Sequence, residues 1–156
     1  MENSNARVED SFNGDMILID RLASFLEKDR WEWDRQGIIS LDDISDAISN
    51  GQVEESAPYG DTWRHLPEER SRNWHIGRII YFINHKDEIK DIEIDSECYE
   101  WHVLPDPIIT DGNHRLLAAI WLQKEGNLKS VHCWFDGRVD LLDYLTGKTD
   151  ERLFEV

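Results

Sequence analysis

Apolar residues recur at helical spacing in two stretches of the first half of the chain. From Asp15, a good N-cap, the spacing predicts a helix that ends near residues 28–30, with apolar positions at Leu18, Leu22, Phe25 and Leu26. A second stripe predicts a helix that begins at Pro67, with acidic residues in its first turn. Its apolar positions follow the i, i+3, i+4, i+7 pattern at Ile76, Ile79, Ile80 and Ile83.

Residues 37–41 fit two interpretations. Ile38 and Ile39 are typical of a short strand. Ser40 with Asp43 instead resembles a capping box, which would open a helix that stops at Asn50-Gly51. Both interpretations hold if the strand ends where the helix begins. Residues 50–66 contain glycine and proline and few aliphatic residues, so we expect a loop there.

The second half of the chain predicts mainly strands around one apolar helix. Strands are expected at residues 92–95, 99–104, 108–110 and 130–135, and helices at residues 116–124 and 141–145. Residues 116–122 are apolar on all sides, so that helix should form the centre of the core. The chain is therefore expected to form one mixed α/β or α+β domain with a small sheet of four to five strands. The domain should cover residues 15–156, after a flexible tail at residues 1–14.

Composition narrows the classes of function. The chain has 156 residues and a formal net charge of −16, which argues against direct binding to nucleic acid and to anionic membranes. No apolar run is long enough to span a bilayer, and the first residues lack the pattern of a signal peptide. Two cysteines outside any CxxC pair, Cys98 and Cys133, are typical of reduced thiols in a cytoplasmic protein. An acidic surface can also engage a basic partner protein.

The most informative segment is residues 107–121. Ile108, Ile109 and Thr110 predict a strand, Asp111-Gly112 a tight turn, and the residues that follow a helix. The first turn of that helix carries Asn113, His114 and Arg115. Because a helix N-terminus has unpaired N–H groups and a partial positive charge, it attracts anions, phosphates above all. Two side chains that can be cationic strengthen this expectation.

A known superfamily has a signature turn that resembles Asp111-Gly112-Asn113-His114-Arg115-Leu116-Leu117-Ala118-Ala119. In the ParB/sulfiredoxin superfamily, a strand is followed by a Gly-x-x-Arg or Gly-x-His-Arg turn and an alanine-rich helix. The strand at residues 92–95, after an isoleucine-rich helix at 74–84, fits the same scheme. The resemblance spans about residues 38–136, which it implies as the core of the domain, and the Asp-Gly-Asn-His-Arg stretch is its specific part.

The resemblance implies a nucleotide, ATP or CTP, or another phosphorylated ligand at this turn. By that likeness Gly112 lets the backbone approach the phosphates, and Asn113, His114 and Arg115 contact them. Asp111 would hold Mg²⁺ or act as a base, and His114 would donate a hydrogen bond or a proton. The reactive cysteine of sulfiredoxins would fall at Asn113, so repair of sulfinic acid is not expected. The DNA-binding helical domain of partition proteins is not expected either, and Asp111 alone does not supply a nuclease metal site.

Structural roles are the alternative for the same residues. His114 could cap the turn and Arg115 could pair with an acid such as Glu93 or Asp95. His75 and Arg78 lie one turn apart on the preceding helix, and could approach the site or form a solvent-exposed pair. No His or Cys spacing indicates a metal.

Two hypotheses about function follow. The first is a nucleotide-binding protein, with hydrolysis of the nucleotide or phosphoryl transfer as an open extension. The second is a non-enzymatic acidic inhibitor or adaptor that binds a basic partner protein, in the manner of a nucleic-acid mimic.

Overall fold

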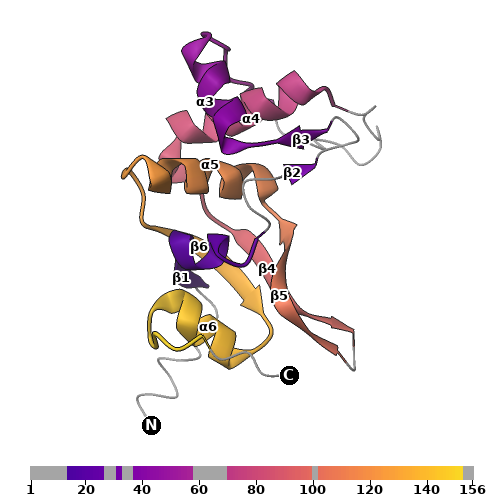
Figure 1. The fold of residues 1–156 in the computed structure, drawn as a ribbon, viewed down its shortest axis with the longest axis vertical. Coiled ribbons are helices and arrows are strands. Elements are labelled where there is room, and N and C mark those ends of the chain that lie inside the picture. Colours follow the sequence, from indigo (N-terminus) through magenta and orange to yellow (C-terminus); the bar gives the residue numbers. More distant parts are fainter. Residues whose placement is uncertain (1–13, 27–30, 33–36, 58–69, 100–101, 153–156) are drawn as a thin grey trace.

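Four strands with alternating buried and exposed residues form a mixed sheet in the order β1-β6-β4-β5 (Figure 1). They are β1 (Asp15–Leu18), β4 (Ile92–Tyr99), β5 (His102–Asp111) and β6 (Ser130–Asp136). β6 runs parallel to β4, whereas β1 and β5 pair antiparallel with their neighbours. This computed structural model describes residues 14–26, 31–32, 37–57, 70–99 and 102–152. The predicted fold class, mixed α+β with a small sheet, is confirmed.

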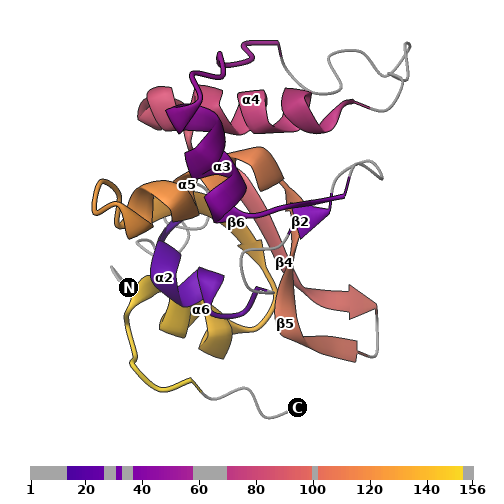
Figure 2. The same cartoon turned by 45° about the horizontal axis from the view of Figure 1, so that its top comes forward.

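Helices pack on this sheet and on one another around a single hydrophobic cluster. They are α2 (Ile19–Ala23), α3 (Leu41–Ser49), α4 (Arg72–Asn84), α5 (Asn113–Lys124) and α6 (Val139–Thr146), with a short 3-10 turn at Lys86–Glu88. As predicted, α5 lies at the centre, with buried residues Leu116, Leu117, Ala118, Ala119, Ile120 and Leu122. A separate two-stranded sheet pairs β2 (Trp31–Glu32) with β3 (Ile38–Ile39). In Figures 1 and 2, α5 lies between α4 and the strands, and the far end of the β4–β5 hairpin extends away from the helices.

The sheet buries one face only. Its inner positions belong to the hydrophobic cluster, and they include Ile17, Ile92, Ile94, Val131 and Cys133. The alternate positions point the other way and are exposed, namely Met16, Glu93, Ile108, Trp134 and Asp136. We refer to these five residues as the open face. An antiparallel or mixed sheet that is covered on one side produces this alternation.

The helix predicted from Asp15 to residues 28–30 is wrong at its start and at its end, because Ser24, Phe25 and Leu26 are not helical. Residues 15–18 form β1 and pair with β6, and the helix that follows is only Ile19–Ala23. Ile17 lies opposite Val131 and both are fully buried or nearly so. Burial beside β6 therefore overrides the helical spacing, because a local pattern cannot indicate which strand will be available to pair. β1 also extends the sheet beyond the predicted core of residues 38–136.

The strands predicted at residues 99–104 and 108–110 are one strand. Tyr99 belongs to β4, and β5 continues from His102 to Asp111 through Pro105 and Pro107. Proline removes a backbone donor, but β5 is an edge strand, and its register with β4 shifts between Asp95 and Glu97. An edge strand with a bulge tolerates proline, so the interruption expected there does not occur.

The region of residues 37–51 confirms both interpretations of its pattern. β3 ends at Ile39, and α3 begins after Ser40, whose side chain and that of Asp43 form the capping box. α3 ends at Asn50-Gly51, where Gly51 has a positive φ. The helix predicted from Pro67 is wrong at its start: Arg70 and Ser71 are not helical, and α4 begins at Arg72 with Ser71 as its N-cap. Pro67, Glu68, Glu69 and the tail at residues 1–13 lie outside the described residues.

Candidate functional site

The turn between β5 and α5 has the geometry that its sequence predicts. Gly112 is the N-cap of α5, with a left-handed φ of 95°, and no side chain caps the helix. A Cβ atom at this position would lie 3.1 Å from Nη2 of Arg115 and 3.3 Å from Cα of Ile92. The backbone conformation and the close packing both require glycine here. The twelve-residue helix therefore starts at a buried residue that provides no side-chain acceptor for its first N–H groups.

Arg115 is held by acceptors within the protein. Its Nη1 donates to the carbonyl oxygens of Lys90, at 2.6 Å, and Asp91, at 3.3 Å. Its Nη2 lies 3.3 Å from Oδ2 of Asp111. The structural alternative for Arg115 is thus realised, although the acid is Asp111 and neither Glu93 nor Asp95. The two carbonyl contacts fix the guanidinium above Gly112, and the Asp111 contact involves a carboxylate that is 62% exposed.

His75 and His114 lie together between α4 and α5. Nδ1 of His75 and Nε2 of His114 are 2.9 Å apart, so one ring donates and the other accepts. The rings are stacked at an interplanar angle of 15°, and Trp74 packs edge-on against both. His75 is fully buried. Of the two interpretations of His75, the structure therefore has the one in which it approaches the turn from the neighbouring helix.

The environment keeps His114 uncharged. Burial, together with electrostatic interactions with His75, Arg78 and Arg115, lowers the pKa of His114 from 6.5 to about 3. An imidazole with this pKa is neutral at pH 7, so the turn has one fixed side-chain cation, Arg115, and not two. The sequence could not predict this, because the neutralising factors come from α4 and from the interior of the fold.

Arg78 is directed to the loop that precedes α4. Its Nη1 donates to the carbonyl oxygens of Glu55 and Ser56, and its guanidinium lies over the rings of Tyr81 and Phe82. Burial lowers the pKa of Arg78, although the group stays charged at any physiological pH. Arg78 thus influences His114 through space, and its hydrogen bonds hold residues 55–56.

Two helices begin at this site. His75 is in the first part of α4 and His114 is in the first turn of α5, and Figure 1 shows both helices starting on the same side of the molecule. The two starts differ in their caps. The Ser71 side chain accepts from the Trp74 N–H at the start of α4, whereas Gly112 offers nothing equivalent at the start of α5. The positive ends of the two helix dipoles add at this point.

Asp111 is the residue for which a metal role was predicted. It lies at the end of β5 opposite Glu93 of β4, and its carboxylate is largely exposed. Among the described residues, no group of three or more His, Cys, Asp or Glu side chains could hold a metal ion. Mg²⁺ usually binds through one or two carboxylates and the phosphates of a ligand, so Asp111 fits such an ion only together with a bound phosphate.

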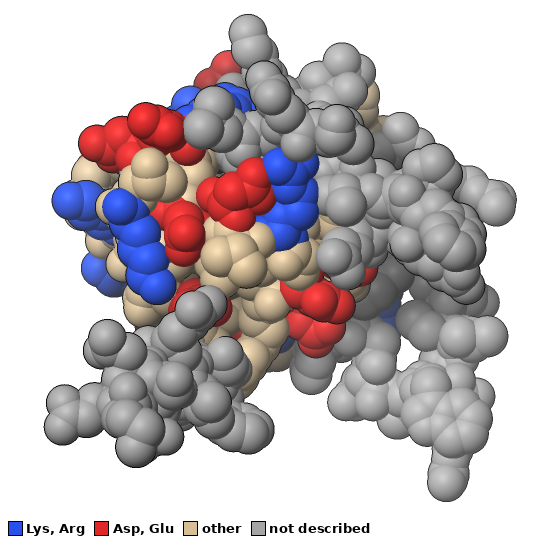
Figure 3. Space-filling view, turned by 90° about the horizontal axis from the view of Figure 1, so that it is seen from below, with Lys and Arg blue, Asp and Glu red and all other residues tan. Residues whose placement is uncertain are grey.

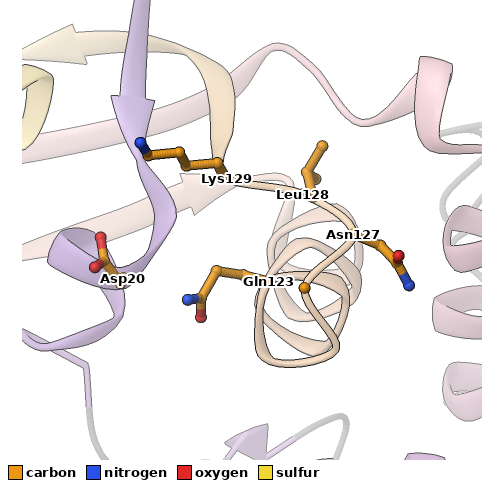
Figure 4. Close-up of a pocket in the computed structure, with 6 residues that line it drawn as sticks. Asp20, Gln123, Asn127, Leu128 and Lys129 are labelled. Atoms are coloured by element: carbon orange, nitrogen blue, oxygen red, sulfur yellow. The ribbon is translucent and has the colours of Figure 1, made fainter.

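A pocket of about 460 Å³ lies at the opposite end of α5. It is lined by Asp20, Gln123, Gly126, Asn127, Leu128 and Lys129, and Figure 4 shows these residues around the end of the helix and the loop to β6. Its polar side chains come from an exposed surface, and none of them belongs to the predicted site. The chemistry of the turn and the position of this pocket therefore disagree.

The sequence did not point to Asp91 and Trp134. Asp91 has a φ of 58°, which is rare for a residue other than glycine but is tolerated best by Asp and Asn. Its carbonyl accepts from Arg115, and its Oδ1 accepts from Nε1 of Trp134 at 3.0 Å. An aspartate directly before a strand was the available signal. Cys133 is a buried free thiol whose pKa burial raises to about 12, so it is unreactive, whereas the side chain of Cys98 lies outside the described residues.

Comparison with known proteins does not assign a family. No protein-family model matches the chain, and no curated protein or solved structure is significantly similar to it. Within the part of the chain that the structure describes, none of the helices has both the length and the apolar character to cross a membrane.

Proposed function

We propose that this protein binds a phosphorylated small molecule, in the first place a nucleoside triphosphate such as ATP or CTP, at the start of α5. The proposal is carried by one observation: a left-handed glycine begins a twelve-residue helix without a side-chain cap. Uncapped N–H groups and the helix dipole favour an anion at that point. The resemblance of residues 111–119 to the signature turn of the ParB/sulfiredoxin superfamily supports the same ligand class.

The contacts of Arg115 are compatible with this role. The ion pair with Asp111 is exposed and long, and such pairs contribute roughly 0–1 kcal/mol. A phosphate group offers more negative charge and bidentate acceptors, so it can replace Asp111 as the partner of Nη2. The contacts of Nη1 with Lys90 and Asp91 would stay in place and keep the guanidinium oriented. Asn113 would contribute its side-chain amide.

Catalysis is a separate part of the proposal. With a pKa of about 3, His114 is a poor proton donor near neutral pH, so its role is to donate a hydrogen bond. That role needs a proton on the nitrogen that faces the ligand, and the contact with His75 selects between the two tautomers. Hydrolysis or phosphoryl transfer would further require Asp111 to position Mg²⁺ or the acceptor.

The first test is thermal stabilisation by a panel of nucleotides, with and without Mg²⁺. A nucleotide at 100 times its Kd stabilises the folded state by about 2.7 kcal/mol, which is readily detected. Arg115→Lys keeps the charge but loses the guanidinium fork, and should remove most of the stabilisation. Arg21→Lys is the matched control, because Arg21 also donates to two carbonyls, those of Tyr144 and Thr149, and to one acid, Asp150. Equal behaviour of the two variants would exclude Arg115 from the site.

Asp111→Asn separates two roles of that carboxylate. If Asp111 only competes with the ligand for Arg115, its replacement should tighten binding of the nucleotide without Mg²⁺. If Asp111 holds Mg²⁺, the same variant should lose the additional stabilisation that Mg²⁺ gives. Asp150→Asn removes the exposed ion pair with Arg21, which is not at the proposed site. This variant should change neither nucleotide binding nor the additional stabilisation by Mg²⁺.

A further inference from the structure

The open face of the sheet presents large apolar side chains to solvent. Met16 is 55% exposed, Ile108 47% and Trp134 38%. They come from three different strands, β1, β5 and β6, at positions that alternate with core residues. Single exposed apolar residues are ordinary, but several on one face of a sheet are typical of an interaction surface.

Trp134 is held in place on this face. Its Nε1 donates to Oδ1 of Asp91 at 3.0 Å, and its ring packs edge-on against His132 at 5.1 Å. The main chain of Asp91 is fixed in turn by Arg115 and by its left-handed conformation. An exposed indole that is already oriented loses little conformational freedom on binding, which is the property of an interface anchor.

Carboxylates on the same face lie next to other carboxylates. Glu93 is opposite Asp111, which also pairs with Arg115, in the pairing of β4 with β5. Asp136 is opposite Asp95 in the pairing of β4 with β6. Like charges on neighbouring strands destabilise a sheet. The structure describes no hydrogen bond or ion pair for the side chains of Glu93 and Asp136. On the face shown in Figure 3, Lys and Arg side chains lie beside Asp and Glu.

We propose that the open face binds a basic segment of a partner protein in which apolar residues alternate with lysine or arginine. The cations would pair with the exposed carboxylates of Glu93 and Asp136, and the apolar residues would cover Met16, Ile108 and Trp134. A metal ion would use the carboxylates only, and the described residues contain no group able to hold one. A nucleic acid would be repelled. This surface is distinct from the ligand site proposed at α5.

The test uses a fluorescently labelled peptide of about twelve residues, with alternating lysine and valine, and measures anisotropy at low salt. Glu93→Gln combined with Asp136→Asn should weaken binding about tenfold, a loss of about 1.4 kcal/mol. The control combines Asp46→Asn with Glu125→Gln, which makes the same change in net charge at exposed positions on α3 and at the end of α5. This double variant should weaken peptide binding less than about twofold. Equal losses in the two double variants would show that only net charge matters and would overturn the proposal.

Two further measurements complete the test. Trp134→Ala should weaken binding of the valine peptide more than binding of a peptide with serine in place of valine, because only the valine peptide covers the apolar residues. An equal effect on both peptides would contradict the proposed apolar contact. Circular dichroism of each variant establishes that the fold is kept, and Trp134→Phe serves where alanine unfolds the protein. Asn113→Ala should leave peptide binding unchanged, so failure at this surface is distinguishable from failure of the nucleotide site.

Discussion

The start of α5 and the open face of the sheet are built from neighbouring elements, yet they differ in whether their charged and polar side chains have hydrogen-bond or ion-pair partners. At α5, Arg115 has three acceptors and His114 is neutral and paired with His75. On the open face, Glu93 and Asp136 stand beside other carboxylates and remain exposed. The difference follows from burial, because a polar group taken out of water must find a partner and an exposed one need not.

The ionisable side chains that a sequence motif contains are therefore not all available to a ligand. The sequence Asp-Gly-Asn-His-Arg suggests two cations. In the folded protein His114 is neutral, and Arg115 already makes hydrogen bonds to other residues. What remains available at α5 is mainly backbone N–H groups, the helix dipole and one exchangeable contact of Arg115. The open face offers full side-chain charges. Three variants, each with a smaller expected change in stability than the one before, probe this difference.

Gly112→Ala should have the largest effect. The new side chain must adopt a left-handed conformation and approach Arg115 and Ile92, so the free energy of unfolding should fall by about 3 kcal/mol. Gly126→Ala is the matched control, since Gly126 has a φ of 80° and nothing within 4 Å of the added carbon. It should lose only about 1 kcal/mol, the cost of the backbone conformation. Urea unfolding measures both, and equal losses would contradict the tight packing at Gly112.

The neutral state of His114 predicts a pH dependence of intermediate size. Because the pKa of His114 is lowered on folding from 6.5 to about 3, the unfolded chain takes up a proton that the folded protein does not. Stability should therefore fall as the pH drops from about 6.5 towards 3, with about 1–2 kcal/mol from this group between pH 6.5 and 5. His114→Gln should reduce the slope in that range. An unchanged slope would mean that His114 titrates normally and is available as a cation at the turn.

Glu93→Gln should have the smallest effect, in the opposite direction. Removing the repulsion with Asp111 should raise the free energy of unfolding by about 0.5 kcal/mol. Asp46→Asn, on the exposed side of α3, should change it by less. The gain from Glu93→Gln should shrink in about 0.5 M salt, because the interaction is exposed to solvent. A loss of stability would instead indicate that Glu93 makes a favourable contact.

The features that can be predicted from the sequence are local ones, whose signals lie within a few residues. The capping box of Ser40 and Asp43, the end of α3 at Gly51, the turn at Gly112 and the buried helix α5 were all predictable, because each depends on backbone conformation or on a continuous apolar pattern. The other features depend on tertiary contacts. Pairing with β6 made residues 15–18 a strand, and an edge position allowed β5 to continue through two prolines. Packing against α4 placed His75 beside His114 and removed its charge. Strand pairing and desolvation depend on partners that are far away in the chain, so no local pattern contains them.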